Sequence, residues 1–121
     1  MAREKVIIVE DDIVVLMSSA QTLRDAGLSV LEAESGDAAA ALLSDCAHEV
    51  AVVFSDIDMP GRLDGLALAE VIQARWPFIT VVLTSGRCRP TTTTLPPPAL
   101  FVPKPYDLAE VSAMMTGLSG G

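Results

Sequence analysis

The chain has 121 residues and a formal net charge of −8, and half of its residues are hydrophobic although only 4% are aromatic. This aliphatic content excludes a disordered chain and predicts a single domain over residues 1–121, with one core and no output domain. The acidic balance argues against a nucleic-acid partner, and no apolar run reaches the roughly 20 residues of a membrane span.

Apolar, strand-like runs alternate along the chain with stretches of helical period. The predicted strands cover 6–9, 29–33, 50–55, 79–84 and 99–102. The predicted helices cover 13–26, 37–46, 64–76 and 107–117, and Gly27 and Pro77 act as stop signals. Because strands and helices alternate, we expect an α/β fold with a doubly wound parallel sheet and helices on both faces.

The segment 86–98 interrupts this alternation with the sequence GRCRPTTTTLPPP. Three consecutive prolines and four threonines make a poor helix. We therefore expect an irregular and mobile loop, with the fourth crossover helix lost or reduced to one turn. The cysteines, Cys46 and Cys88, match no metal-binding spacing, which favours reduced thiols and a cytoplasmic location.

Polar side chains follow four of the five predicted strands. In chain order they are Glu10, Asp11, Asp12, Asp56, Asp58, Thr84, Ser85 and Lys104. Ligands of open α/β sheets bind beyond the carboxyl ends of the strands. A sheet in the order 2-1-3-4-5 would therefore bring Glu10, Asp11 and Asp56 together.

Several carboxylates in one cleft repel one another and need a cation, and oxygen ligands favour Mg²⁺. A carboxylate beside such a cation can attack phosphorus, while Lys104 and Thr84 could stabilise the transferred group. Taken singly, acids that precede a helix complement its dipole, Asp58 suits a turn and Lys104 suits a solvated surface. Their convergence at one sheet edge favours a shared site.

Five segments carry a resemblance to a known family. VIIVEDD, FSDIDMPG, DGLALAEVI, VVLTSG and FVPKPYDLAEV occur in the order found in the receiver domains of two-component response regulators, which the chain resembles over nearly its whole length. The resemblance implies a flavodoxin-like, five-stranded sheet in the order 2-1-3-4-5. It is weakest over 86–98, as in single-domain receivers with an abnormal fourth helix.

The resemblance also implies a role for each acid. Asp56 would be the phosphoacceptor, Asp11 a direct Mg²⁺ ligand and Glu10 a ligand acting mostly through water. Asp58 would offer its backbone carbonyl to the ion. Asp12 is an additional acid, which would either tune metal affinity or cap the first helix.

The remaining implied roles concern the phosphoryl group and the response to it. Lys104 would pair with the phosphoryl group, Thr84 would be the switch hydroxyl, and Phe101 falls at the aromatic switch position. The sequence MPGRLDG is one residue longer than the usual spacing, so the loop after Asp56 should be longer.

The function that this resemblance implies is Mg²⁺-dependent transfer of a phosphoryl group to Asp56. The donor would be the phosphohistidine of a histidine kinase or phosphotransfer protein. The chain would be a phosphoacceptor signalling domain, not an enzyme, apart from slow self-dephosphorylation, and would act by protein contact or as a phosphate sink. Two alternatives stay open: a haloacid-dehalogenase-like phosphatase using Asp56-Ile57-Asp58, and a protein-binding module independent of phosphorylation.

Overall fold

The computed structural model describes residues 4–59, 64–85, 99–104 and 106–118. The elements, in chain order, are β1 Lys5–Val9, α1 Ile13–Asp25, β2 Ser29–Ala33, α2 Gly36–Cys46, η1 Ala47–Glu49, β3 Val50–Asp56, α3 Gly65–Arg75, β4 Thr80–Ser85, β5 Leu100–Pro103 and α4 Leu108–Leu118. Every predicted strand and helix is present, with bounds shifted by no more than one residue. The predicted irregular segment 86–98 and most of the lengthened loop after Asp56 lie outside the described residues.

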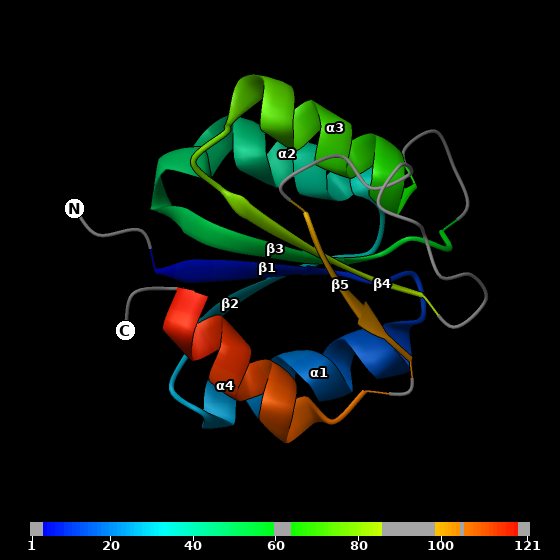
Figure 1. Cartoon of the computed structure of the whole chain (residues 1–121), viewed down its shortest axis with the longest axis vertical. Helices are drawn as coiled ribbons and strands as arrows, with labels where there is room; N and C mark the ends of the chain where they lie inside the picture. The colour runs from blue at the N-terminus through cyan, green and yellow to red at the C-terminus, as the bar shows by residue number, and fades with distance from the viewer. Residues whose placement is uncertain (1–3, 60–63, 86–98, 105, 119–121) are drawn as a thin grey trace.

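The five strands form one parallel sheet in the order β2-β1-β3-β4-β5. Helices α2 and α3 cover one face of this sheet, and α1 and α4 cover the other (Figure 1). The predicted doubly wound, flavodoxin-like fold is therefore confirmed. The strand order reverses between β1 and β3, and the carboxyl ends of these strands are the place where such sheets bind ligands. No helix within the described ranges is both long and apolar enough to cross a membrane.

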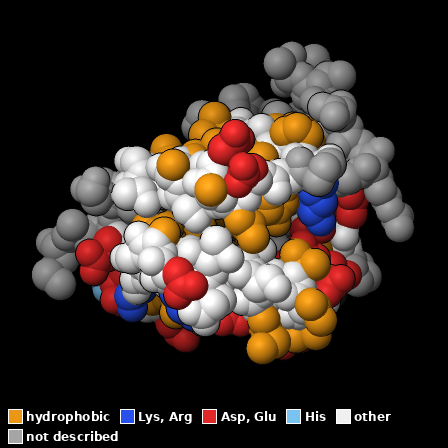
Figure 2. Space-filling model, turned by 90° about the horizontal axis from the view of Figure 1, so that it is seen from below, with side chains coloured by type: hydrophobic (Ala, Val, Ile, Leu, Met, Phe, Trp, Pro, Cys, Tyr) orange, Lys and Arg blue, Asp and Glu red, His pale blue; other side chains and the backbone are white. Residues whose placement is uncertain are grey.

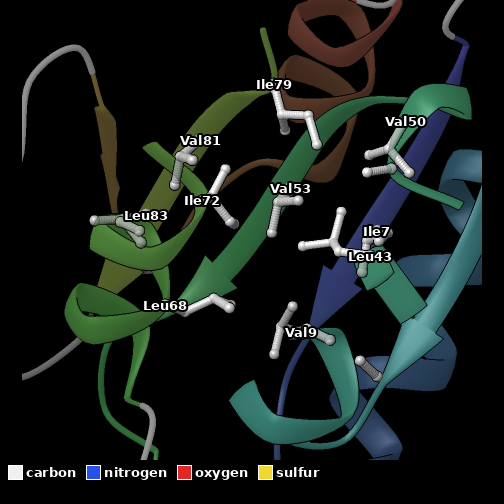
Figure 3. Close-up of a cluster of buried hydrophobic side chains, with 14 of the residues drawn as sticks. Ile7, Val9, Leu43, Val50, Val53, Leu68, Ile72, Ile79, Val81 and Leu83 are labelled. Carbon is white, nitrogen blue, oxygen red and sulfur yellow. The ribbon is translucent and has the colours of Figure 1, made fainter. Parts of the chain in front are cut away.

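The sheet separates two hydrophobic clusters, and successive residues of β1 from Val6 to Val9 belong to opposite ones. In β1, Ile7 and Val9 pack into the cluster under α2 and α3, while Val6 and Ile8 pack into the cluster over α1 and α4. Figure 3 shows the first cluster, with side chains from several strands meeting those of the covering helices. This two-sided burial explains why β1 and β3 are apolar along nearly their whole length. It also makes the central strands a rigid support for the residues that follow them.

Polar side chains cap the first three helices. Asp12 accepts hydrogen bonds from the backbone N–H groups of Val14 (3.0 Å) and Val15 (3.3 Å) at the start of α1. Ser35 and Asp64 cap α2 and α3 in the same way. Asp12 therefore has the second of its two expected roles, because its side chain satisfies N–H groups that the helix itself leaves unpaired.

Replacing Asp12 with alanine is expected to lower the free energy of unfolding by about 1 kcal/mol, because the helix loses its N-cap. Asp12→Asn keeps an oxygen acceptor and should unfold close to the wild type. Urea denaturation of the three proteins measures the difference. Equal destabilisation by alanine and asparagine would contradict the capping role.

Candidate functional site

The carboxyl ends of β1, β3, β4 and β5 bring the predicted site residues to one edge of the sheet. Asp56 is the last residue of β3 and pairs in register with Thr84 on β4. Glu10 directly follows β1, where its backbone N–H donates to the carbonyl of Ala33 on β2 (3.0 Å). Lys104 directly follows β5. The parallel topology thus joins residues that lie far apart in the sequence.

Three carboxylates form a cluster at this edge. Oxygens of Glu10, Asp11 and Asp56 all lie within 4.8 Å of one another. Glu10 and Asp56 are 5% and 4% exposed, whereas Asp11 is exposed to solvent. Three acids this close repel one another when ionised, so a bound cation would stabilise the cluster. Carboxylate oxygens with one side open to water suit Mg²⁺, which keeps several of its own waters. The donor set therefore fits the predicted ion.

Lys104 supplies the positive charge within the described part of the site. Its Nζ lies 2.6 Å from Oδ2 of Asp56 and 3.5 Å from Oε2 of Glu10. Burial alone would lower the pKa of Lys104, but the hydrogen bond to Asp56 and the negative charges of Asp56 and Glu10 outweigh it and raise the pKa. The side chain is therefore a cation directed at Asp56, the acid for which the resemblance implies the role of phosphoacceptor.

The pKa of Glu10 is raised from 4.5 to about 7. Burial is the main cause, and the negative charge of Asp56 adds to it. The backbone N–H of Asp12, which donates to Oε1 of Glu10 (3.1 Å), and the charge of Lys104 act in the opposite direction. Without a cation, Glu10 is therefore partly protonated near neutral pH.

Magnesium binding is expected to become about tenfold tighter between pH 6 and pH 8, because bound Mg²⁺ favours ionised Glu10 and displaces its proton. The raised pKa also means that the cation-free domain loses stability as the pH rises from 4.5 through about 7. Isothermal titration calorimetry in buffers of different ionisation enthalpy measures both the affinity and the proton release. Glu10→Gln should remove this pH dependence, and a wild-type affinity that is constant with pH would contradict the prediction.

Asp58 lies close to Asp56, and its backbone and its carboxylate have different hydrogen-bond partners. Its backbone N–H donates to Oδ1 of Asp56 (2.8 Å), while its carboxylate accepts a hydrogen bond from Oγ of Ser85 (2.6 Å). The carboxylate of Asp58 is therefore held by a hydrogen bond to the last residue of β4. This arrangement is compatible with a cation contact through the backbone carbonyl alone, as the resemblance implies.

Thr84 carries a buried hydroxyl and lines a small cavity together with Asp56. Among the described residues, Thr84 Oγ1 is one of two buried side-chain atoms without a hydrogen-bond partner, the other being Oγ of Ser112. The cavity has a volume of about 10 Å³, and its lining includes Glu10, Asp56, Thr84 and Tyr106. That volume is near the minimum for one water molecule. An unpaired buried donor at this place suits an acceptor that arrives with the transferred group.

Tyr106 is the residue at this site that sequence reasoning missed. Its ring packs edge-on against Phe54 at 5.4 Å between centroids, and it lines the small cavity together with Ser19 of α1. Burial raises the pKa of Tyr106, so the hydroxyl stays protonated at neutral pH. Phe101, at the predicted aromatic switch position, packs against the cluster under α2 and α3, and its switch role stays a prediction. The position of Tyr106, two residues after Lys104, was the only sequence signal for it.

A groove of about 540 Å³ opens beside Lys104, along α1. Its lining residues are Val14, Val15, Ser18, Ser19, Lys104, Tyr106 and Leu108. Val14 is 69% exposed, and Ile13 and Met17 of the same helix are also exposed. Figure 2, which views the face covered by α1 and α4, shows exposed hydrophobic side chains at one end of this face, near acidic and basic groups. The groove thus joins an apolar helix surface to the charged site.

Known proteins with a similar sequence or fold are receiver domains or contain a segment similar to this chain. The family model described as response regulator receiver domain matches residues 6–116. Sensor kinase CckA of Brucella abortus is 33% identical over 110 residues, which cover 88% of this chain but only 12% of that protein. A receiver domain protein from Clostridium thermocellum has a TM-score of 0.88 at 20% identity, covering 99% of this chain and 95% of that chain, and so shows likeness of fold. The receiver domain of NtrX from Brucella abortus has a TM-score of 0.79 at 29% identity, with coverages of 93% and 98%.

Proposed function

Because the chain belongs to the response regulator receiver domain family, we propose that Asp56 accepts a phosphoryl group from a phosphohistidine. One observation carries this proposal: a nearly buried carboxylate lies 2.6 Å from a lysine ammonium and within a cluster of three acids. A buried acid between a fixed cation and a cation-binding cluster is suited to nucleophilic attack on phosphorus.

The transfer exchanges one bond to phosphorus for another. A carboxylate oxygen of Asp56 attacks the phosphorus, the bond from phosphorus to the donor imidazole nitrogen breaks, and the imidazole takes up a proton. Lys104 and the unpaired hydroxyl of Thr84 donate to the phosphoryl oxygens, where charge accumulates. The same contacts hold the phosphorylated aspartate afterwards.

We assign the cation site to Asp11, Asp56 and the backbone carbonyl of Asp58, with Glu10 acting through water. Magnesium bound there would neutralise the carboxylates and the incoming phosphoryl oxygens. Glu10 must lose its proton for full occupancy, and the amide of Asp58 keeps one Asp56 oxygen oriented. The opposite Asp56 oxygen faces Lys104.

We further propose that the donor is a histidine kinase or a histidine phosphotransfer protein that docks along α1. The groove beside Lys104 offers such a partner an apolar surface that leads directly to Asp56. A cytoplasmic location, the absence of a nucleic-acid partner and the choice between a downstream protein contact and a phosphate-sink role stay predictions. In each case the chain would act as a phosphoacceptor with at most slow self-dephosphorylation, not as a turnover enzyme.

The phosphatase alternative needs Asp58 to protonate a leaving group. The hydrogen bond from Ser85 to the carboxylate of Asp58 argues against that role. The alternative of a binding module without phosphorylation has no use for the close arrangement of Asp56, Lys104 and Glu10. We therefore favour the phosphoacceptor function.

Incubation with acetyl phosphate and magnesium is expected to add the mass of one phosphoryl group to the intact protein. Asp56→Asn should show no increase, because the amide is not a competent nucleophile. Asp45→Asn, which changes an exposed acid in the last turn of α2, should be phosphorylated like the wild type. Time points short enough to precede hydrolysis are required, and an unchanged wild-type mass at those times would refute the proposal.

A further inference from the structure

Ser85 connects two loops of the site, although neither the family resemblance nor the proposed chemistry gives it a role. It is the last residue of β4 and is 2% exposed. Its hydroxyl donates to Oδ2 of Asp58 (2.6 Å), and its carbonyl accepts a hydrogen bond from the backbone N–H of Lys104 (3.1 Å). A single buried residue thus joins the loop after β3 to the end of β5.

We propose that Ser85 is a positioning residue whose hydroxyl fixes the Asp58 loop for magnesium binding. The proposal rests on the function proposed above, because it concerns the same cation site. Ser85 itself need not touch the ion: it acts through Asp58, whose backbone carbonyl is the assigned ligand.

The described contacts show how the loop is held. The backbone N–H of Ile57 donates to the carbonyl of Thr84 (2.8 Å), which extends the pairing of β3 with β4 by one residue. Beyond that residue, the hydrogen bond from Ser85 continues the attachment to β4, now through the side chain of Asp58. The N–H of Asp58 is bound to Asp56 at the same time (2.8 Å). Asp58 is therefore fixed at both its backbone and its carboxylate, which limits rotation of the peptide that bears its carbonyl.

The hydroxyl of Ser85 also gives the Asp58 carboxylate a hydrogen-bond partner outside the acidic cluster. Glu10, Asp11 and Asp56 already place three carboxylates within 4.8 Å of one another. A fourth carboxylate there would increase the repulsion in the cation-free domain. By accepting a hydrogen bond from Ser85, the half-buried carboxylate of Asp58 has a neutral partner outside the cluster. Groups that orient metal ligands in this way strongly affect the affinity of the site for its metal ion.

Ser85→Ala is expected to weaken magnesium binding about tenfold, as the loss of an orienting partner of a metal ligand does. Calorimetry measures the dissociation constant, and the magnesium dependence of phosphorylation by acetyl phosphate gives a second reading. The magnesium concentration for half-maximal rate should rise about tenfold, while saturating magnesium restores most of the rate. A general folding defect would instead lower the rate at saturation.

Two control comparisons isolate the contact with Asp58. Ser112→Ala removes another buried serine hydroxyl, in α4, which has no hydrogen-bond partner among the described residues, and should leave magnesium affinity unchanged. In an Asp58→Ala background, the Ser85→Ala change should have no further effect on affinity. In an Asp58→Asn background, where the amide oxygen can still accept from Ser85, it should again weaken binding.

The outcomes separate this inference from the function on which it rests. If the wild type neither binds magnesium nor accepts a phosphoryl group, the proposed function fails. If the wild type does both and Ser85→Ala binds magnesium as tightly as the wild type or more tightly, the positioning role alone is refuted. Equal weakening by Ser85→Ala with and without the Asp58 side chain would also refute it.

Discussion

The Lys104→Met variant is expected to accept a phosphoryl group on the order of 10²-fold more slowly than the wild type, as when a charge-stabilising donor is removed from an active site. The ammonium of Lys104 lies 2.6 Å from Asp56 and is the group best placed to neutralise a phosphoryl oxygen there. Methionine keeps much of the length of the side chain and removes the charge. Stopped-flow or quenched-flow phosphorylation with acetyl phosphate at saturating magnesium measures the rate.

The same substitution should strengthen the binding of magnesium, although it slows phosphoryl transfer. Lys104 also lies 3.5 Å from Glu10, so its charge opposes a second cation in the cluster. Removing that charge is expected to tighten magnesium binding while it slows phosphoryl transfer. Lys5→Met, which breaks a partly exposed ion pair with Glu49 at the start of β1, is the matched control and should change neither quantity. A Lys104→Met rate equal to that of the wild type would contradict the assigned role.

The Gly65→Ala variant is expected to lose about 1–3 kcal/mol of unfolding free energy, as overpacked positions do. A Cβ atom at Gly65 would lie 2.5 Å from the carbonyl oxygen of Asp56 and 2.7 Å from Cα of Ile57. Both are backbone atoms, so α3 or the end of β3 must move. Because β3 ends in Asp56, phosphorylation should slow as well. Urea denaturation and the mass assay measure the two effects.

Gly117→Ala is the matched control for this change. A Cβ atom at Gly117, in α4, would meet nothing within 4 Å. Alanine there should raise the unfolding free energy by roughly 0.5 kcal/mol, since glycine is a poor helix former. If Gly65→Ala were as stable and as readily phosphorylated as Gly117→Ala, the close approach of α3 to Asp56 could not be part of the site.

The sheet and the acidic cluster could be predicted from the sequence because both follow from long-range patterns. The apolar runs of β1 and β3 require burial on both faces, and the alternation with helices requires parallel strands. Once the strand order is given, Glu10, Asp56 and Lys104 must meet at one edge. The alternation and the polar strand ends follow from residue type and spacing, whereas the strand order is what the resemblance to receiver domains implies.

The contacts of individual side chains could not be predicted in this way. The hydrogen bond from Ser85 to Asp58 depends on side-chain rotamers and on the register of two strands. The role of Asp12 was undecided because an acid before a helix suits both a cap and a metal site. Tyr106 lies between β5 and α4, and only the folded chain places it with Thr84 around one cavity.

The central claim is that the phosphoryl group is carried by the carboxylate of Asp56. Borohydride reduction of the freshly phosphorylated protein, followed by peptide mass spectrometry, tests it most directly, since an aspartyl phosphate is reduced to homoserine. We expect homoserine at position 56 in the magnesium-treated wild type and unmodified aspartate when magnesium is removed by a chelator. Homoserine at another position, or a phosphorylated protein with unmodified Asp56, would contradict the account.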